Sequence, residues 1–143
     1  MKKSILLSTL LLLVILISCK DTKKVAENAT PEIPSGKYEI RVVQGKVLNT
    51  KQYISFVASE NKISGKTDCN GYTGGYTIDK NTINFGPMTA TKMYCEEHVM
   101  EAERSFFIAL KNTATFVIDN NMLTLVSGEN GSIMLKAIKS KEN

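Results

Sequence analysis

Hydrophobic and polar residues alternate along most of the chain after residue 36, in short runs that are separated by turn-forming residues. Tyr38, Ile40 and Val42 stand at every second position, which is typical of a strand with one buried face. Asp and Asn gather at 79–81 and 119–121, where their side chains favour turns by bonding the nearby backbone. The pattern predicts strands at residues 36–43, 53–58, 62–66, 72–78, 82–85, 115–118, 122–126 and 132–138.

The period changes between residues 96 and 111, where the sequence EEHVMEAERSFFIALK contains neither Gly nor Pro. Apolar residues recur there at intervals of three or four, as on one face of a helix: Val99, Ala102, Phe106 and Leu110, with Met100 and Phe107 widening the stripe. Glu96 and Glu97 would lie in the first turn and Lys111 in the last, where the helix dipole favours their charges. We therefore predict one main helix.

These elements predict an α+β fold that is mostly β. Short links between successive strands favour an antiparallel meander, because neighbours in sequence then pair in space. Two groups of strands on either side of one helix predict a curved antiparallel sheet, or a partly open β-barrel, with the main helix packed on it. The stretch from residue 36 to residue 143 has the length of one ordinary domain.

The start of the chain has the form of an export signal. Lys2 and Lys3 precede an apolar run from Ile5 to Ile17, as in a secretory signal peptide. The sequence LISC at residues 16–19 resembles a bacterial lipobox, in which the leader is cut before the Cys and a diacylglyceryl group is attached to its sulfur. We therefore expect the mature protein to begin at Cys19 and to be held at a membrane by its N-terminal lipid.

A single transmembrane helix and an ordinary thiol at Cys19 are the other interpretations of this segment. A helix needs about 20 apolar residues to cross a hydrocarbon core, and the run of about thirteen residues here falls short of that length. The lipid anchor accounts for the basic start, the short apolar run and the Cys together.

The composition divides the chain into three parts. Pro31 and Pro34 stand among small and polar residues that bury too little apolar surface to order themselves. Lys20 and Asp21 do not form a clear inner-membrane retention signal, so we expect the outer membrane, on its periplasmic or surface face. The predicted organisation is a lipoprotein signal peptide at 1–18, a flexible tether at 19–35 and one domain at 36–143.

Charge and motifs exclude several classes of protein. The net charge of +4 falls by two when Lys2 and Lys3 leave with the leader. Basic residues are scattered and lack interleaved aromatics, so we expect no nucleic acid partner. The chain has no phosphate-binding loop, dinucleotide motif or paired carboxylates. Asp68, Asn70 and Gly71 lack the further ligands of a calcium loop, so we expect a turn there and neither metal nor cofactor.

Cys69 and Cys95 are an even pair in a chain that we expect to be exported into an oxidising compartment, which favours a disulfide. Closing a loop of about 26 residues would stabilise the domain by roughly 3.5 kcal/mol. Two buried reduced thiols are an alternative. Zinc is disfavoured because the chain has no Cys-x-x-Cys and a single His, His98. Cys95 could also be a nucleophile with His98 as its base.

Two segments of the chain are similar to a known family. Residues 68–76 read DCNGYTGGY and residues 91–95 read TKMYC, followed by Glu103 in the helix and by MLTL at 122–125. Over about residues 36–137 this order resembles the META domain, the family of the bacterial heat-shock protein HslJ. Asp68 stands where that family usually has Gly, which weakens the case for a left-handed glycine before Cys69. Tyr94 stands where a small residue is usual.

The resemblance implies a small antiparallel β structure with a helix packed against it. It assigns structural roles to six motif residues: Asn70, Tyr72, Gly74, Tyr76, Met93 and Glu103. Asn70 would brace a turn, and Gly74 with Gly75 would permit a bulge. Tyr72, Tyr76 and Phe85 would form one aromatic cluster under the helix.

The resemblance also implies a function without an assigned reaction, because family members are linked to heat shock and drug tolerance. We expect a monomeric, non-enzymatic cell-envelope lipoprotein that serves as a stress-response or accessory binding module. The alternative is a carrier or pilot-like module that holds an apolar ligand or envelope partner in a groove between sheet and helix, lined by Met88, Met93, Met100, Phe106 and Phe107. An enzyme using Cys95 and His98, or a carboxylate of Asp68, Glu96 or Glu97, is the third hypothesis.

Overall fold

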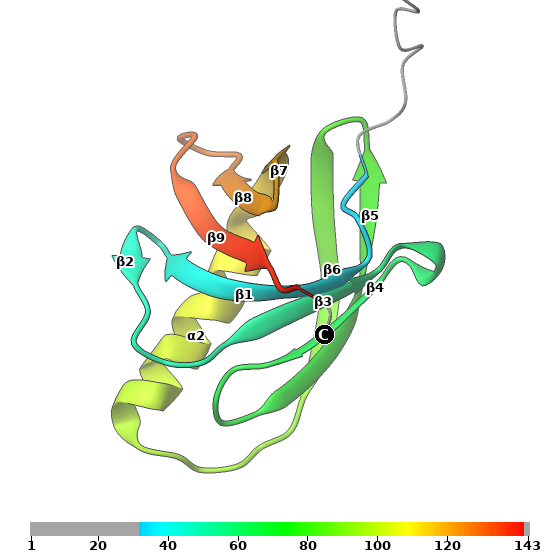
Figure 1. The fold of residues 1–143 in the computed structure, drawn as a ribbon. Helices are drawn as coiled ribbons and strands as arrows, with labels where there is room; N and C mark the ends of the chain where they lie inside the picture. The colour runs from blue at the N-terminus through cyan, green and yellow to red at the C-terminus, as the bar shows by residue number, and fades with distance from the viewer. Residues whose placement is uncertain (1–31, 142–143) are drawn as a thin grey trace, which may run out of the picture.

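The computed structural model describes residues 32–141, which form strands, one 3-10 turn and one α-helix (Figure 1). The signal peptide, the lipid attachment at Cys19 and the tether up to residue 31 lie outside the described residues. The elements in order are β1 (Gly36–Val43), β2 (Lys46–Val47), β3 (Tyr53–Val57), η1 (Ala58–Glu60), β4 (Lys62–Lys66), β5 (Gly71–Asp79), β6 (Thr82–Ala90), α2 (Glu97–Asn112), β7 (Thr113–Asp119), β8 (Met122–Ser127) and β9 (Ile133–Lys139).

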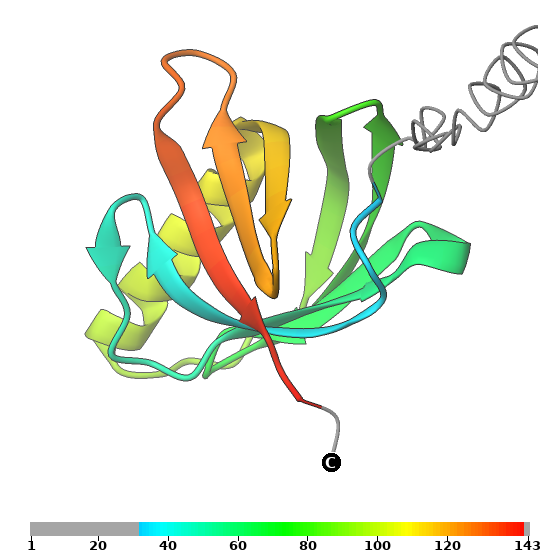
Figure 2. The ribbon, with the colours of Figure 1, turned by 45° about the horizontal axis from the view of Figure 1, so that its top comes forward.

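Antiparallel pairing closes the sheet into a barrel. Strands β1 and β3 to β9 pair in chain order, and β9 returns to pair with β1, so that Ile40 lies opposite Ala137. Strand β2 extends this barrel as a short partner of β1. Figure 2 shows the curved strands wrapping around the core, with α2 behind β7, β8 and β9. The prediction of a mostly β fold with one main helix packed on a curved antiparallel sheet is confirmed for the described residues.

The barrel is weakly closed at the seam between β6 and β7. In the described part of the chain, these two strands share one residue pair, Thr82 with Thr115. The Phe116 N–H also donates to the Asn81 carbonyl over 3.1 Å. Beyond this pair, the rest of β6 has β5 on one side and no strand of residues 32–141 on the other. The barrel is therefore partly open along β6.

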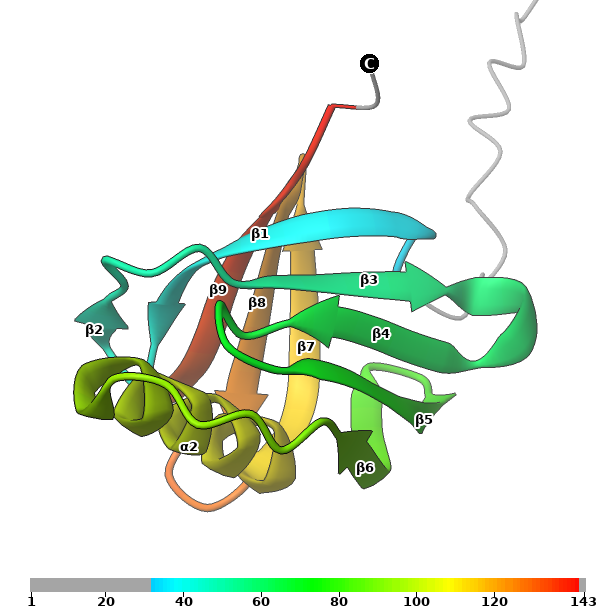
Figure 3. The ribbon, with the colours of Figure 1, turned by 90° about the horizontal axis from the view of Figure 1, so that it is seen from below.

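Helix α2 crosses one end of the barrel, where it packs on β9, β1 and β6 (Figure 3). Its core-facing side runs through four buried residues: Glu103, Phe106, Ala109 and Leu110. The predicted stripe is therefore only partly right, because Val99 and Met100 are half-buried and the acidic Glu103 lies inside. The helix ends without a linker: the Thr113 hydroxyl donates to the Ala109 carbonyl over 2.8 Å, and β7 begins at Thr113 itself.

Aromatic residues form two clusters in the core, where the sequence predicted one. The Tyr72 ring lies under α2, with centroids 5.0 Å from Phe106 and 5.6 Å from Phe107. The Tyr76 ring instead packs edge-on against Phe56 at 5.3 Å, away from the helix. A bulge separates the two tyrosines on β5, because Gly74 pairs with Met88 whereas Tyr76 pairs with Phe85. The predicted bulge is present, and the surplus residue comes from β6, where Gly86 and Pro87 lie opposite Gly75.

The packed domain begins before the predicted boundary at residue 36. Ile33 has no exposed surface and belongs to the core. The Tyr38 hydroxyl donates to the Pro34 carbonyl over 2.8 Å, and the Ala58 N–H donates to the Ser35 hydroxyl over 2.9 Å. The prediction that the flexible tether reaches residue 35 is wrong for these residues, because one apolar side chain in a polar stretch is enough to dock it.

Candidate binding groove and the loop that frames it

Glu103 brings a carboxylate from α2 into the end of the barrel. The Thr67 hydroxyl donates to one carboxylate oxygen, and the Asn70 side-chain amide donates to the other over 3.1 Å. Only 9% of the Glu103 surface is exposed. A buried carboxylate is tolerated when its oxygens accept hydrogen bonds, and both oxygens of Glu103 do so. The helix is thereby fixed to the turn between β4 and β5.

Asn70 connects three segments of the chain. Its Oδ1 accepts from the Thr91 hydroxyl over 2.7 Å and from the Met93 N–H over 2.8 Å. Its Nδ2 donates to Glu103 and to the Met93 carbonyl over 3.3 Å. This side chain was predicted to brace a turn through bonds to the backbone, and in the structure its bonds to the Met93 backbone hold the loop between β6 and α2. The backbone N–H of Asn70 braces the turn, by donating to the Thr67 hydroxyl over 3.2 Å.

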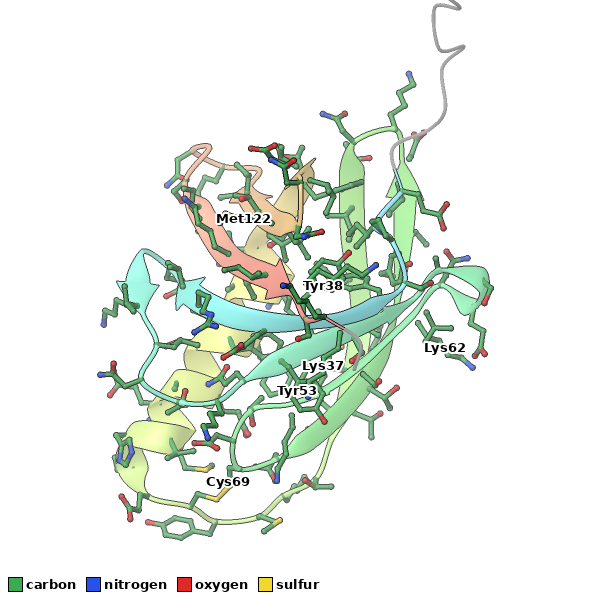
Figure 4. The ribbon with its side chains drawn as sticks, viewed as in Figure 1. Lys37, Tyr38, Tyr53, Lys62, Cys69 and Met122 are labelled. Carbon is green, nitrogen blue, oxygen red and sulfur yellow. A yellow bond between two sulfur atoms is a disulfide. The ribbon has the colours of Figure 1, made fainter. Side chains whose placement is uncertain are left out.

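A disulfide joins Cys69 to Cys95 beside these hydrogen bonds, and Figure 4 shows it at the end of the barrel where the chain enters α2. The bond spans 26 residues of sequence. Neither sulfur is a free thiol, so the predictions of buried thiols and of a Cys95 nucleophile do not describe this structure. His98 lies on the exposed surface, with its Nδ1 3.4 Å from the Glu96 carboxylate.

The turn before the disulfide has a left-handed residue, and that residue is Asp68. Its φ angle is +80°. Asp is one of the few side chains that visit this region without large cost. The turn before Cys69 is therefore left-handed without a glycine.

A glycine that the sequence did not single out makes room for Tyr72. The Tyr72 hydroxyl crosses β4 at Gly65 to donate to the Tyr53 carbonyl over 3.0 Å. A Cβ atom at Gly65 would overlap both that carbonyl and the Tyr72 ring. Burial raises the pKa of Tyr72 well above its ordinary value of 10.0. Gly74 has the equivalent role in the next strand pair, since a Cβ there would overlap the sulfur of Met88.

A groove of about 840 Å³ lies between β6 and α2, along the open edge of the barrel. Its walls are mostly apolar, and its lining residues are Asn84, Phe85, Gly86, Pro87, Met88, Ala90, Thr91, Lys92, Glu103, Phe107, Leu110 and Lys111. Of the residues predicted to line a groove between sheet and helix, Met88 and Phe107 do so. Met93, Met100 and Phe106 do not: the Met93 side chain is 60% exposed on the loop, and Phe106 is buried in the core.

The loop from β6 to α2 forms one end of this groove. Thr91 and Lys92 line it, and Asn70 fixes the loop by accepting from the Thr91 hydroxyl and from the Met93 backbone N–H. Met93 therefore acts through its main chain, although its side chain faces outward. Among residues 32–141, no group of three or more His, Cys, Asp or Glu side chains is placed to hold a metal ion. Within the same residues, no helix is long and apolar enough to cross a membrane.

A family model described as the META domain matches residues 31–140. The chain belongs to the META domain family. A search of curated proteins finds no match.

Two solved NMR structures share the fold of this chain at low sequence identity, and a crystal structure matches it less well. An NMR structure of a protein from Burkholderia xenovorans is 17% identical, with a TM-score of 0.60 over 84% of this chain and 99% of its own. A second NMR structure is 22% identical, with a TM-score of 0.58 over 73% of this chain and 89% of its own. A crystal structure of a DUF4847 family protein from Bacteroides vulgatus is 22% identical over 64% of this chain and 61% of its own, with a TM-score of 0.47.

Four of the six motif residues of this META domain support the groove without lining it: Asn70, Tyr72, Gly74 and Met93. Glu103 lines the groove, and Tyr76 packs against Phe56 elsewhere in the core. Asn70 and the Met93 backbone hold the loop at one end. Tyr72 supports Phe107, which forms part of the helical wall. Gly74 admits the Met88 side chain, which forms part of the β6 wall. These residues thus support both walls of the groove without lining it themselves.

Proposed function

We propose that this META-domain protein is a non-enzymatic, lipid-anchored module of the bacterial cell envelope, and that it binds an apolar ligand or partner segment in the groove between β6 and α2. The observation that carries this proposal is the groove itself. Its volume of about 840 Å³ falls in the range of sites for small ligands, which is about 300–1,000 Å³. Apolar side chains from both walls would gain free energy by burying an apolar surface against them.

The polar side chains in and beside the groove are already hydrogen-bonded or disulfide-bonded, which supports binding over catalysis. Glu103, the acidic residue in the groove lining, accepts hydrogen bonds at both carboxylate oxygens. All the bonding positions of the Asn70 side chain are occupied, and the sulfur of Cys95 is bonded to Cys69. A general base must lie within hydrogen-bond reach of the proton that it removes. These groups are instead committed to holding the loop and the helix.

The anchor rests on the sequence of the leader. The basic start, the short apolar run and Cys19 together favour cleavage and lipid attachment at the Cys. A variant with Cys19→Ala should lose incorporation of radiolabelled palmitate and should leave the membrane fraction. Retained labelling of that variant would contradict the anchor. Equal labelling of Cys69→Ala and wild type is the matched control.

The groove is tested with dodecanoate as a simple apolar probe and nuclear magnetic resonance as the readout. Dodecanoate should shift the signals of Met88 and Leu110, which lie on opposite walls. Ala90→Leu should weaken binding severalfold, because Ala90 lines the groove and a larger side chain fills part of it. Thr89→Leu is the matched control, since Thr89 is the exposed neighbour on the same strand. Unchanged groove signals at millimolar dodecanoate would contradict binding of an apolar small molecule in the groove.

A carrier of an apolar molecule is the second candidate, favoured by the open seam between β6 and β7. A carrier releases its cargo, and a groove along an open edge gives the cargo a way in and out. Mass spectrometry of an organic extract of the protein, purified from its host, should then find a bound lipid or similar compound. An extract free of such a compound would leave the accessory binding module as the better description.

A further inference from the structure

One wall of the groove is an unpaired strand edge. Residues 84–90 of β6 line the groove or lie beside its lining, and β5 pairs with them from the opposite side. Within residues 32–141, the pairing of β6 with β7 stops at Thr82. Every second residue of an edge strand points its N–H and C=O away from the paired neighbour. The edge of β6 therefore presents backbone donors and acceptors next to the apolar walls.

This edge distinguishes between two kinds of apolar occupant. A hydrocarbon chain seated along β6 would exclude water from these backbone groups without bonding them, at a cost comparable to a lost hydrogen bond for each group. An extended polypeptide would supply a matching row of acceptors and donors, as a strand does in any sheet. The backbone chemistry of the wall therefore favours a polypeptide.

Two lysines stand at opposite ends of the open edge. Lys92 follows the end of β6 by two residues, and Lys111 precedes β7, whose pairing with β6 is at Thr82. Both line the groove, and neither takes part in an ion pair within the described residues. The carboxylate of Glu103, between them, already accepts from Thr67 and Asn70. The groove is therefore complementary to a segment with acidic residues at its ends.

We propose that the groove binds an extended segment of a partner protein, which adds to the edge of β6 as a new strand. The segment would turn apolar side chains toward α2 and place acidic residues near Lys92 and Lys111. Seven residues of β6 edge would pair with a segment about 23 Å long, at about 3.3 Å per residue. This inference rests on the proposal that the groove is the binding site, and it names the class of occupant.

Pro87 disfavours pairing of this edge with a second copy of the chain. It lies near the middle of the open edge, and it has no N–H to donate. Proline and bulges are devices by which proteins prevent edge-to-edge association of like strands. A partner strand would bond on either side of Pro87, beside Phe85 and beside Met88, with a break between.

The probe is a labelled seven-residue peptide of alternating Val and Thr with a Glu at each end, titrated into the isotope-labelled domain. Binding should shift the backbone amide signals of residues 84–86 and 88–90. It should also slow hydrogen exchange of those amides among them that point away from β5. Two N-methylated peptides test directly whether the peptide backbone forms hydrogen bonds with the edge of β6. Methylation at the alternate positions that face β6 should abolish binding, and methylation at the intervening positions should leave it within about twofold, because those groups point away from the strand.

Charge reversal tests the role of the lysines. Lys92→Glu combined with Lys111→Glu should weaken binding of the Glu-ended peptide by about tenfold, which corresponds to two exposed ion pairs of ordinary strength. The same variant should bind a Lys-ended peptide more tightly than the wild type does. Lys80→Glu is the matched control, because Lys80 lies on the exposed turn between β5 and β6.

The two probes, dodecanoate and the peptide, allow this inference to fail separately from the proposed function. Dodecanoate binding without peptide binding would overturn strand addition and would leave the groove as an apolar site. Equal binding of the two N-methylated peptides would also overturn it, because recognition would then come from side chains. Failure of both dodecanoate and peptide at millimolar concentration would overturn the inference and the proposed function together.

Discussion

The Asn70 amide donates to the Glu103 carboxylate over 3.1 Å, between residues that are 33 positions apart in the chain. This bond connects the turn after β4 to the middle of α2. The same Asn side chain holds the Met93 backbone. The helix and the loop that precedes it are therefore positioned by one buried amide.

Replacing Asn70 with Ala should lower the free energy of unfolding by about 3 kcal/mol, because a buried carboxylate and a backbone segment each lose a partner. Asn70→Ala together with Glu103→Ala should cost about 1–2 kcal/mol less than the sum of the single changes, since each single change leaves the other residue unpaired. Urea unfolding followed by circular dichroism measures both. Asn49→Ala, on an exposed loop residue, should stay within about 0.5 kcal/mol of the wild type. Simple additivity would show that the two side chains do not support each other.

The disulfide should contribute about 3.5 kcal/mol, as expected for a closed loop of 26 residues. Reduction of the wild type, or the double change of Cys69→Ser and Cys95→Ser, should lower the urea midpoint accordingly. The hydrogen bonds of Asn70 should keep the loop in place after reduction, so the amide signals of residues 91–93 should persist. A reductant that leaves the urea midpoint unchanged would contradict this stabilisation.

Gly65→Ala should destabilise the domain by about 2–4 kcal/mol, because the added methyl group overlaps the Tyr53 carbonyl and the Tyr72 ring. Gly71→Ala is the matched control on the neighbouring strand. A Cβ atom there meets only the Gly65 carbonyl at 3.9 Å, so the change should be close to neutral. Equal effects of the two changes would show that the crossing of Tyr72 over Gly65 is unimportant.

The domain should lose stability as the pH rises above about 10. Burial raises the folded-state pKa of Tyr72 well above 10.0, so the unfolded chain releases this proton first. The stabilisation is complete below the unfolded pKa and is lost as the pH rises toward the folded pKa. Tyr72→Phe should flatten the pH dependence of the urea midpoint, whereas Tyr94→Phe, at a residue that is 91% exposed, should not. An identical slope in both variants would contradict the assignment to Tyr72.

Local patterns in the sequence were sufficient for most of the elements. The helical period between residues 96 and 111 and the Asx-rich turns gave α2 and the hairpins within a few residues. Strand β6 was predicted to stop at Phe85, because Gly86 and Pro87 interrupt strands in general. They are accommodated as a bulge on an unpaired edge, and the strand continues to Ala90. The two residues of β2 were too few to give any period.

The groove could not be predicted from local patterns, because it depends on contacts between distant segments. The groove exists because β6 separates from β7 after one residue pair, and this separation depends on how the whole barrel closes. The placement of Glu103 inside the helix face depends on Thr67 and Asn70, which lie 36 and 33 residues away. The family resemblance identified Asn70 and Glu103 as structural residues. The side-chain amide that joins them and the role of Gly65 became visible in the structure.

The helix that forms one wall of the groove is fixed at both ends, and this constrains the kinetics of binding. The disulfide and Asn70 hold the segment before α2, and β7 begins at the residue after its last turn. Because both ends of this wall are held among residues 32–141, binding at the proposed site should need no opening of α2. The observed association rate should rise linearly with ligand concentration, without the plateau that a slow conformational step would impose.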